Sequence, residues 1–161
     1  DRWPQATIVG CEPNREIYRV RARDYPGELL PVAVGQTEGR VTLHPGVEDG
    51  GMSSLLLPTQ DFPIVHGEPY EVPCTTIDHI APPCRRGWLW LDIEGYEANA
   101  LRGATETLRR CKWVSLEVSN RPRRQGEATA QEIESILTPY GFRLIATHDD
   151  GPSHDRLYAK A

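Results

Sequence analysis

Three carboxylates follow a short apolar run in the middle of the chain. Residues 88–91 are bulky and apolar, and Asp92, Glu94 and Glu97 come directly after them. The run is too short for a buried helix, so it predicts a buried strand that leads into a helix. Ligands of open α/β sheets bind outside the carboxyl ends of the strands, where these acids are placed. Asp92 and Glu94 are therefore candidate general bases, and the structural alternative is that they stabilise the first turn of the helix.

Further polar residues stand at comparable positions. Glu117 closes a predicted strand at 113–118 and would face the same crevice, either to hold an acceptor or to make a buried structural hydrogen bond. Ser54 and its neighbour Ser53 lie in a loop and either line a ligand pocket or order that loop. Asp92 and Glu94 alone are too few ligands for Mg²⁺, so no metal site is predicted.

The composition describes an ordinary globular domain. A chain of 161 residues fits one domain spanning residues 1–161, and 18 Lys and Arg against 23 Asp and Glu give a net charge of -5. This balance offers no overall electrostatic case for nucleic acid or for an anionic membrane. The sequence has neither a transmembrane stretch nor a signal peptide pattern, and its four cysteines have no zinc-ligand spacing. We expect a cytoplasmic protein with reduced thiols.

Strand and helix patterns alternate along the chain. A capping box of Thr129 and Glu132 precedes an apolar stripe that ends at Gly141, which predicts a helix. The expected strands are 7–11, 29–35, 40–44, 70–76, 88–91 and 113–118. Two further helices are expected, one that begins at Pro13 and one that spans 96–110. At the C-terminus a hairpin is expected to pair 142–146 with 156–159 through a loop at 147–155. This order predicts an α/β fold with a mostly parallel sheet, helices on both faces and an antiparallel C-terminal hairpin.

Six short motifs occur together in the order and spacing of one enzyme family. They are IVGCEPN at 8–14, VAVG at 32–35, MSSL at 52–55, VPCTTID at 72–78, LDIEGYE at 91–97 with LRGA at 101–104, and LEV at 116–118. On these motifs the chain resembles the FkbM family of methyltransferases over nearly its whole length. The resemblance implies a class I, Rossmann-like methyltransferase fold, S-adenosylmethionine as methyl donor, and a hydroxyl of a sugar, a glycan or another small metabolite as acceptor.

The resemblance also implies a cofactor site. The acid that closes the second strand of such folds binds the ribose hydroxyls, which gives Glu12 that role, and charge-assisted hydrogen bonds from two hydroxyls suit a carboxylate. Ala33 and Val34, at the end of the third strand, are expected near the adenine. The structural alternative is that Glu12 caps the helix beginning at Pro13. Among the five histidines His79 has the strongest claim to a role, because it adjoins a family motif.

One departure from the family concerns the beginning of the domain. The first strand of the family and its glycine-rich turn are absent, which leads us to expect an N-terminally truncated domain whose strands at 7–11 and 89–91 have unpaired edges. A missing N-terminal segment or a second copy of the chain would complete the sheet. Two functions follow as hypotheses, an O-methyltransferase or a non-enzymatic binding or assembly module that keeps the fold.

A run of basic residues at 121–124 has two interpretations. Arg121, Arg123 and Arg124 surround Pro122 in a polar stretch that follows a predicted strand. Such a run could contact a phosphate or an anionic glycan, but a solvated loop is the simpler interpretation.

Overall fold

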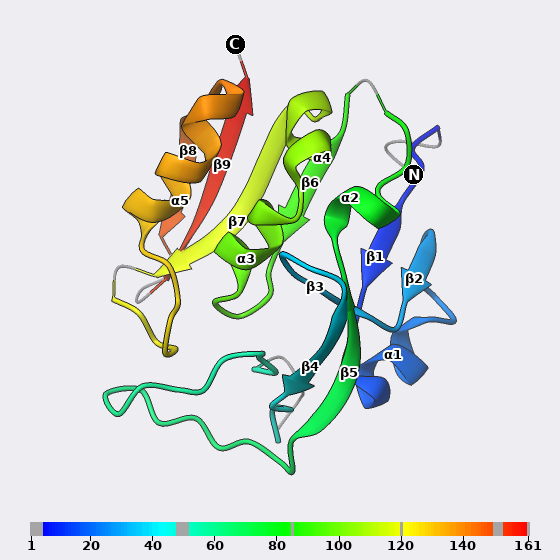
Figure 1. Ribbon diagram of the computed structural model, residues 1–161, viewed down its shortest axis with the longest axis vertical. Helices are drawn as coiled ribbons and strands as arrows, with labels where there is room; N and C mark the ends of the chain where they lie inside the picture. The colour runs from blue at the N-terminus through cyan, green and yellow to red at the C-terminus, as the bar shows by residue number, and fades with distance from the viewer. Residues whose placement is uncertain (1–4, 48–51, 85, 120, 150–152, 161) are drawn as a thin grey trace.

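The computed structural model describes residues 5–47, 52–84, 86–119, 121–149 and 153–160, and shows a mixed α/β architecture (Figure 1). Its strands fall into three sheets, ordered β1-β2, β3-β5-β4 and β6-β7-β9-β8. The strands are β1 (Val9–Cys11), β2 (Glu28–Leu30), β3 (Ala33–Val34), β4 (Gly39–Leu43), β5 (Tyr70–Thr75), β6 (Trp88–Leu91), β7 (Trp113–Ser119), β8 (Phe142–Asp149) and β9 (Ser153–Lys160). The helices are α1 (Arg15–Arg21), α2 (Ile77–Ile80), α3 (Glu97–Arg102), α4 (Thr105–Arg110), α5 (Ala130–Leu137) and the 3-10 helix η1 (Thr138–Tyr140).

The four-stranded sheet contains the predicted C-terminal hairpin. β6 and β7 are parallel, and β9 lies antiparallel between β7 and β8. The hairpin is longer than the sequence predicted, because residues 147–149 and 153–155 belong to the strands and not to the loop. His148 pairs with Asp155 in the ladder, so polar residues extend both strands beyond the predicted apolar segments.

The predicted single, mostly parallel sheet is not present among the described residues. β1 and β2 form a parallel pair, whereas β5 lies parallel to β3 and antiparallel to β4. The predicted strand 29–35 is in fact two strands in different sheets, and Pro31 lies between them. Proline has no N–H to donate to a strand ladder, which explains the interruption.

The main core lies between the four-stranded sheet and helices α3, α4 and α5, which are in front of that sheet in Figure 1. Its side chains that are at most 1% exposed include Leu101, Leu108, Val114, Leu116, Ile133, Leu137 and Tyr158. α5 begins with the predicted capping box, in which Thr129 and Glu132 exchange hydrogen bonds, and the helical segment ends at Gly141 with a left-handed φ of 85°. These local predictions are confirmed.

The predicted helix 96–110 is two short helices. α3 ends and α4 begins around Gly103 and Ala104, and Gly103 lies so close to the Gly35 backbone that an added Cβ would be 2.0 Å from the Gly35 carbonyl oxygen. Asp78 caps α4 from a distant part of the sequence, accepting hydrogen bonds from the Glu106 and Thr107 amides at 2.9 and 2.7 Å. Tertiary contacts therefore interrupt the helical periodicity.

β6 is less buried than predicted. Leu91 is 4% exposed and Leu89 packs against the core, but Trp88 and Trp90, which alternate with them, are 51% and 71% exposed. Successive strand residues point to opposite faces, so the two indoles share the face away from the core, where they stack with centroids 6.2 Å apart. Among the described strands β6 pairs only with β7, which is consistent with the predicted open edge.

None of the helices in the described part of the chain is both long and apolar enough to cross a membrane.

Candidate functional site

The turn between β6 and α3 has an unusual backbone. Glu94 has a φ of 57°, rare for a residue with a side chain, and Gly95 follows with a φ of 97°. Glu97, at the start of α3, accepts hydrogen bonds from the Ile93 amide at 3.1 Å and the Gly95 amide at 3.3 Å. Such strain, on the order of 1–3 kcal/mol, persists where surrounding contacts fix the backbone, and it is typical of functional sites.

This turn brings three of the predicted site residues together. Asp92, Glu94 and Glu117 each have a carboxylate oxygen within 4.8 Å of the others, at the carboxyl ends of β6 and β7. We call these three residues the acid cluster. Asp92 is exposed, while Glu94 and Glu117 are half-buried. The structure therefore brings the three acids to the same edge of the sheet, as the sequence predicted.

Two adjacent arginines neutralise two members of the acid cluster. Arg124 donates to Glu94 at 2.8 Å, and Arg123 donates to Glu117 at 2.8 Å and to the Ser119 hydroxyl at 3.0 Å. The interpretation of residues 121–124 as a solvated loop is thus wrong for these two side chains, of which Arg124 is only 2% exposed. They turn inward because the half-buried carboxylates need counter-charges.

Asp92 differs from the other two acids. No hydrogen bond or ion pair of its carboxylate is found within the residues that the structure describes. Although Asp92 is exposed overall, partial desolvation of its carboxylate raises its pKa, and the charges of Glu117 and Asp155 raise it further, while Arg123 opposes them. Burial also raises the pKa of Glu94, but the hydrogen bond and charge of Arg124 limit that increase. Asp92 is consequently the acid whose charge is least compensated.

The connection between β4 and β5 covers this end of the sheet (Figure 1). We call its residues 52–66 the roof segment. Ser54 donates to the Glu94 carbonyl oxygen at 2.8 Å, Thr59 donates its amide to the Arg123 carbonyl at 2.9 Å, and Gln125 donates its amide to Leu57 at 2.8 Å. Ser54 is 1% exposed, so its hydroxyl orders the roof segment, and its predicted role in substrate binding stays a prediction.

Glu12 lies at the end of β1, as the resemblance implied. One carboxylate oxygen accepts a hydrogen bond from the Asn14 amide at 2.7 Å, and burial raises the Glu12 pKa although this bond lowers it. The cap of α1 is Asn14 and not Glu12, because the Asn14 side chain accepts from Glu16 and Ile17, and the helix begins at Arg15 and not at Pro13. Glu12 is thus not the helix cap that the structural alternative required.

The Asn14 amide group also contacts the segment that leads to the acid cluster. Its Nδ2 donates to Ser53 Oγ at 3.0 Å, and the neighbouring Ser54 bonds to Glu94. Ser53 and Ser54 therefore connect the end of β1 to the β6–α3 turn. The two predicted halves of the site, Glu12 and the acid cluster, are joined by two consecutive serines.

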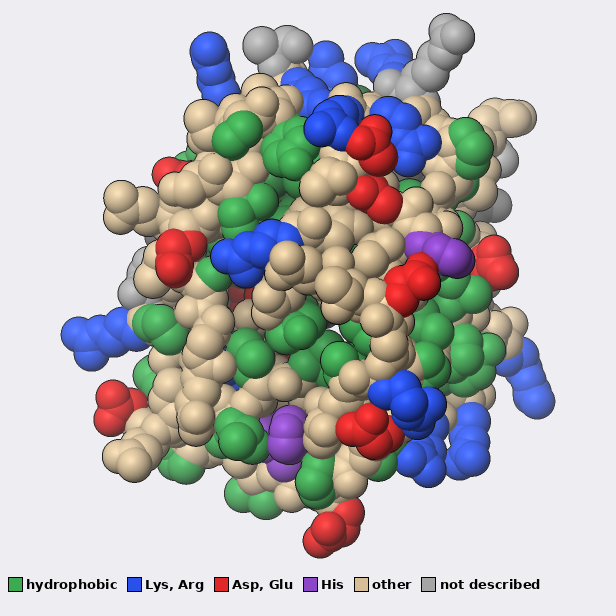
Figure 2. Space-filling view, viewed as in Figure 1, with side chains coloured by type: hydrophobic (Ala, Val, Ile, Leu, Met, Phe, Trp, Pro, Cys, Tyr) green, Lys and Arg blue, Asp and Glu red, His purple; other side chains and the backbone are tan. Residues whose placement is uncertain are grey.

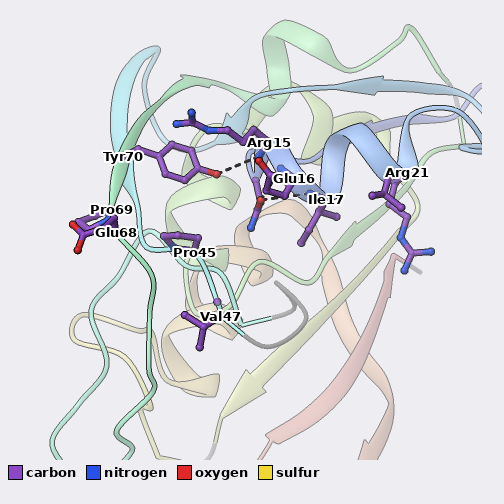
Figure 3. Close-up of a pocket in the computed structure, with 12 residues that line it drawn as sticks. Arg15, Glu16, Ile17, Arg21, Pro45, Val47, Glu68, Pro69 and Tyr70 are labelled. Carbon is purple, nitrogen blue, oxygen red and sulfur yellow. Dashed lines mark hydrogen bonds between the residues drawn. The ribbon is translucent and has the colours of Figure 1, made fainter.

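A cleft of about 760 Å³ opens beside Asn14 (Figure 3). Arg15, Glu16 and Ile17 of α1 form one wall, facing Pro45 and Val47 across the cleft, and Tyr70 closes one end. The Arg15 guanidinium lies 3.8 Å from the Tyr70 ring centroid, and the Arg15 amide donates to the Tyr70 hydroxyl at 3.2 Å. No member of the acid cluster lines this cleft. The cleft is thus a neighbouring recess, connected to the cluster through Ser53 and Ser54.

The other predicted site residues lie at different depths. Ala33 and Val34 are 2% and 8% exposed, so their proposed contact with adenine stays a prediction. His79 is exposed and pairs with Glu38 at 2.6 Å.

Sequence reasoning named Glu97 among the acids and Arg124 in a solvated loop, but it did not predict that Glu97 accepts backbone hydrogen bonds in the turn or that Arg124 pairs with Glu94. The sequence did contain a signal for Arg124. Arg123 and Arg124 closely follow the strand that ends near Glu117, and acids brought together in a partly buried site need cations.

Charges on the face seen in Figure 2 are of both signs and interspersed, mostly around its rim, while hydrophobic side chains occupy much of its middle. This face carries no single-sign field of the kind that attracts nucleic acid. A divalent cation at the acid cluster would compete with Arg123 and Arg124 for two of the three carboxylates. Two of the three carboxylates already have an arginine as counter-charge. The absence of a metal stays a prediction.

The fold and the site define a mixed α/β domain with acids gathered at the carboxyl ends of its strands. A family model described as the methyltransferase FkbM domain matches residues 1–144. The chain therefore belongs to the FkbM methyltransferase family. The 2-O-methyltransferase NoeI of Sinorhizobium fredii (strain NBRC 101917 / NGR234) is 24% identical over 171 residues, covering 96% of this chain and 70% of that protein. No solved structure matches the chain significantly. The family and the relative both support a methyltransferase, and the α/β architecture is consistent with such a domain.

Proposed function

We propose that the chain is the core of an S-adenosylmethionine-dependent O-methyltransferase. The observation that carries this proposal is the acid cluster at the ends of β6 and β7, in a chain of a methyltransferase family. A bound S-adenosylmethionine would supply an electrophilic methyl group on a sulfonium. The protein must then align an acceptor hydroxyl and receive its proton.

Asp92 is the proposed proton acceptor. With S-adenosylmethionine bound, transfer of its methyl group to the acceptor oxygen would give a methyl ether and S-adenosylhomocysteine, and the Asp92 carboxylate would take up the hydroxyl proton. A base needs a free carboxylate with a raised proton affinity, and Asp92 fits because its pKa is raised. Glu94 and Glu117 are proposed to orient the acceptor, with Arg124 and Arg123 holding their carboxylates in place.

Glu12 is the proposed ribose ligand. Its position at the end of β1 and its partial burial fit a carboxylate that accepts hydrogen bonds from two hydroxyls. The Asn14 amide donates to Oε1 of this carboxylate and fixes its orientation. Ala33 and Val34 are proposed to lie near the adenine, at the end of β3.

The proposed acceptor is a hydroxyl of a small metabolite, a sugar or a glycan. The similar protein from Sinorhizobium fredii is named a 2-O-methyltransferase, which supports an oxygen acceptor here. The cleft beside α1 is of the size that holds small ligands. Ser54 belongs to the proposed acceptor site through the backbone of Glu94, which it fixes. A cytoplasmic location, with neither nucleic acid nor membrane as partner, is part of the same proposal.

Calorimetric titration with S-adenosylhomocysteine tests the cofactor site. Glu12→Ala removes a carboxylate that would accept charge-assisted bonds, each worth about 1.5–3 kcal/mol, so affinity should fall about 10- to 100-fold. Glu106→Gln, an exposed change on α4, is the matched control and should bind like the wild type. Unchanged affinity in Glu12→Ala would remove Glu12 from the ribose role.

The open edge of β6 supports an alternative function. Among the described strands nothing pairs with that edge, and two exposed tryptophans flank it, as expected for a binding or assembly module. A segment encoded upstream in the parent open reading frame, or a second copy of the chain, is proposed to complete the sheet. No binding of S-adenosylhomocysteine by the protein expressed from the whole reading frame would favour the module over the enzyme.

A further inference from the structure

Arg124 is the most deeply buried charged side chain in the part of the chain that the structure describes. It is 2% exposed, and its guanidinium contacts three separate places in the sequence. One terminal nitrogen donates to Glu94 Oε2 at 2.8 Å and to the Met52 carbonyl oxygen at 3.1 Å, and the other lies 3.2 Å from His66 Nε2. Met52 and His66 are the two ends of the roof segment, and Glu94 is in the β6–α3 turn.

These contacts determine the charge states of the three side chains. An arginine donates hydrogen bonds and never accepts them, so His66 Nε2 must be the acceptor and the ring must be neutral. Burial and the Arg124 charge lower the His66 pKa, which agrees with a neutral ring. Glu94 is then the only ionised partner of the Arg124 guanidinium among the described residues, and a buried cation needs such a partner.

Arg124 is also held from its own backbone. Its amide and the Arg123 amide both donate to Glu127 Oε2, and Pro58 forms a β-bridge with Arg124. The Cγ of Arg124 lies 3.1 Å from where a Gly95 Cβ would be, so the side chain passes directly over the turn. Arg123 differs, because among the described residues its side-chain bonds reach only Glu117 and Ser119.

We propose that Arg124 is a positioning residue that fastens the roof segment to the β6–α3 turn and keeps Glu94 as a carboxylate, so that the acceptor proton passes to Asp92. The statement about the proton rests on the proposed function. The fastening and the charge of Glu94 do not depend on it, and each can be measured in the protein without cofactor or acceptor.

Carboxyl carbon NMR of ¹³C-labelled protein measures the charge of Glu94, with Glu94→Gln to assign its signal. An opposite charge at this range lowers a carboxyl pKa by about 1–3 units, so Arg124→Met should raise the Glu94 pKa by about that shift. Arg124→Lys keeps the charge and should largely prevent the shift. Arg109→Met, which removes an exposed arginine on α4, is the control and should leave the Glu94 signal unchanged. An unchanged Glu94 pKa in Arg124→Met would overturn the proposal.

Hydrogen exchange measures the fastening. Arg124→Met and Arg124→Lys should both speed exchange of the Ser54 and Leu56 amides about 10-fold or more, because neither side chain can bond Glu94, Met52 and His66 at once. Arg123→Met, which breaks only the pair with Glu117, should leave these two amides protected. If Arg124→Met does not fold, Glu94→Gln tests the same contact from the other side and should also speed their exchange. Full protection in Glu94→Gln and Arg124→Lys would contradict the fastening role.

The pH dependence of methyl transfer tests the statement about the proton. Glu94→Gln should keep the acidic limb of the kcat profile, whereas Asp92→Asn should abolish it together with most of the turnover. Loss of that limb in Glu94→Gln would overturn the assignment. If the protein transfers no methyl group at all, the proposed function fails while the NMR and exchange results still decide the role of Arg124.

Discussion

Asp92 and Glu94 are two residues apart at the end of β6, yet their surroundings give them different chemistry. Glu94 is tied to a buried arginine, whereas Asp92 faces the negative charges of Glu117 and Asp155. A carboxylate held by a guanidinium gains little by accepting a proton, while a carboxylate beside like charges gains more. At the residue scale, the neighbouring charges therefore support the proposed division between a positioning role for Glu94 and an acid–base role for Asp92.

Asp92→Asn tests this division directly. General-base catalysis contributes about 10²–10⁴-fold, so turnover should fall by that order while affinity for S-adenosylhomocysteine stays at the wild-type value. The measurement pairs a methyl-transfer assay with calorimetry, and the exposed Asp24→Asn serves as control. Full activity in Asp92→Asn would show that Asp92 is not the base.

The buried carboxyl group of Glu97 should make the free energy of unfolding depend on pH. Burial raises its pKa from 4.5 to about 7, against the opposing bonds from Ile93 and Gly95. The folded protein therefore holds this proton more tightly than the unfolded chain, so the contribution of Glu97 is fully present below pH 4.5 and is lost as pH rises to about 7. The loss should be on the order of 3 kcal/mol.

Urea unfolding at a series of pH values between 4.5 and 8 measures this effect. Glu97→Gln retains an oxygen for the two backbone amides but cannot ionise, so it should flatten the decline in the free energy of unfolding over this range. The exposed Glu106→Gln should keep the wild-type slope. An equal decline in Glu97→Gln would assign the pH dependence to other groups.

At the scale of elements, the site depends on where helices are interrupted. α3 and α4 replace the single helix that periodicity predicted, because Gly103 packs against the Gly35 backbone and Asp78 caps α4. The interruption brings the end of β3 against the start of α4. The end of β3, which is proposed to lie near the adenine, and the junction of α3 and α4 thus meet at Gly35 and Gly103.

Gly103→Ala should destabilise the protein by about 1–3 kcal/mol, the usual cost of overpacking. The φ of Gly103 is -88°, which alanine adopts freely, so the cost arises from the contact with the Gly35 carbonyl alone. Gly67→Ala is the matched control, since its added Cβ would have its nearest neighbour at 3.5 Å. Thermal and urea unfolding should show a lower free energy of unfolding for Gly103→Ala only. If both variants were as stable as the wild type, the contact between Gly103 and the Gly35 carbonyl would be relaxed in solution.

Features that depend on a few adjacent residues could be predicted from the sequence. The capping box at Thr129, the left-handed Gly141 and the C-terminal hairpin are all confirmed. The interruption at Gly103 and the buried Arg124 could not be predicted in the same way, because their causes lie at Gly35 and at Glu94, far along the chain. The acid cluster was predictable because parallel strands bring their carboxyl ends to one edge.

At the scale of the whole molecule, the strands do not form one continuous sheet. β1 and β6, which the family resemblance would place on either side of one further strand, belong to different sheets in the described structure. Trp88 and Trp90 expose their rings beside the open edge of β6, a combination of unpaired backbone and apolar surface that favours association. The proposed completion of the sheet by an upstream segment or by a second copy would cover both.

Replacing both tryptophans tests whether this face associates. Sedimentation velocity of residues 1–161 at increasing concentration should show self-association that Trp88→Gln with Trp90→Gln reduces, because the change removes two stacked apolar rings from the exposed face. Val65→Gln, at a residue that is 73% exposed, is the control and should associate like the wild type. In a protein extended by its upstream sequence, an added strand on β6 should protect both indoles from acrylamide quenching and leave a monomer. Two results would show that the open edge of β6 is not a pairing surface. One is self-association that the double change does not reduce. The other is a monomeric wild type whose two indoles are fully quenched both in residues 1–161 and in the extended protein.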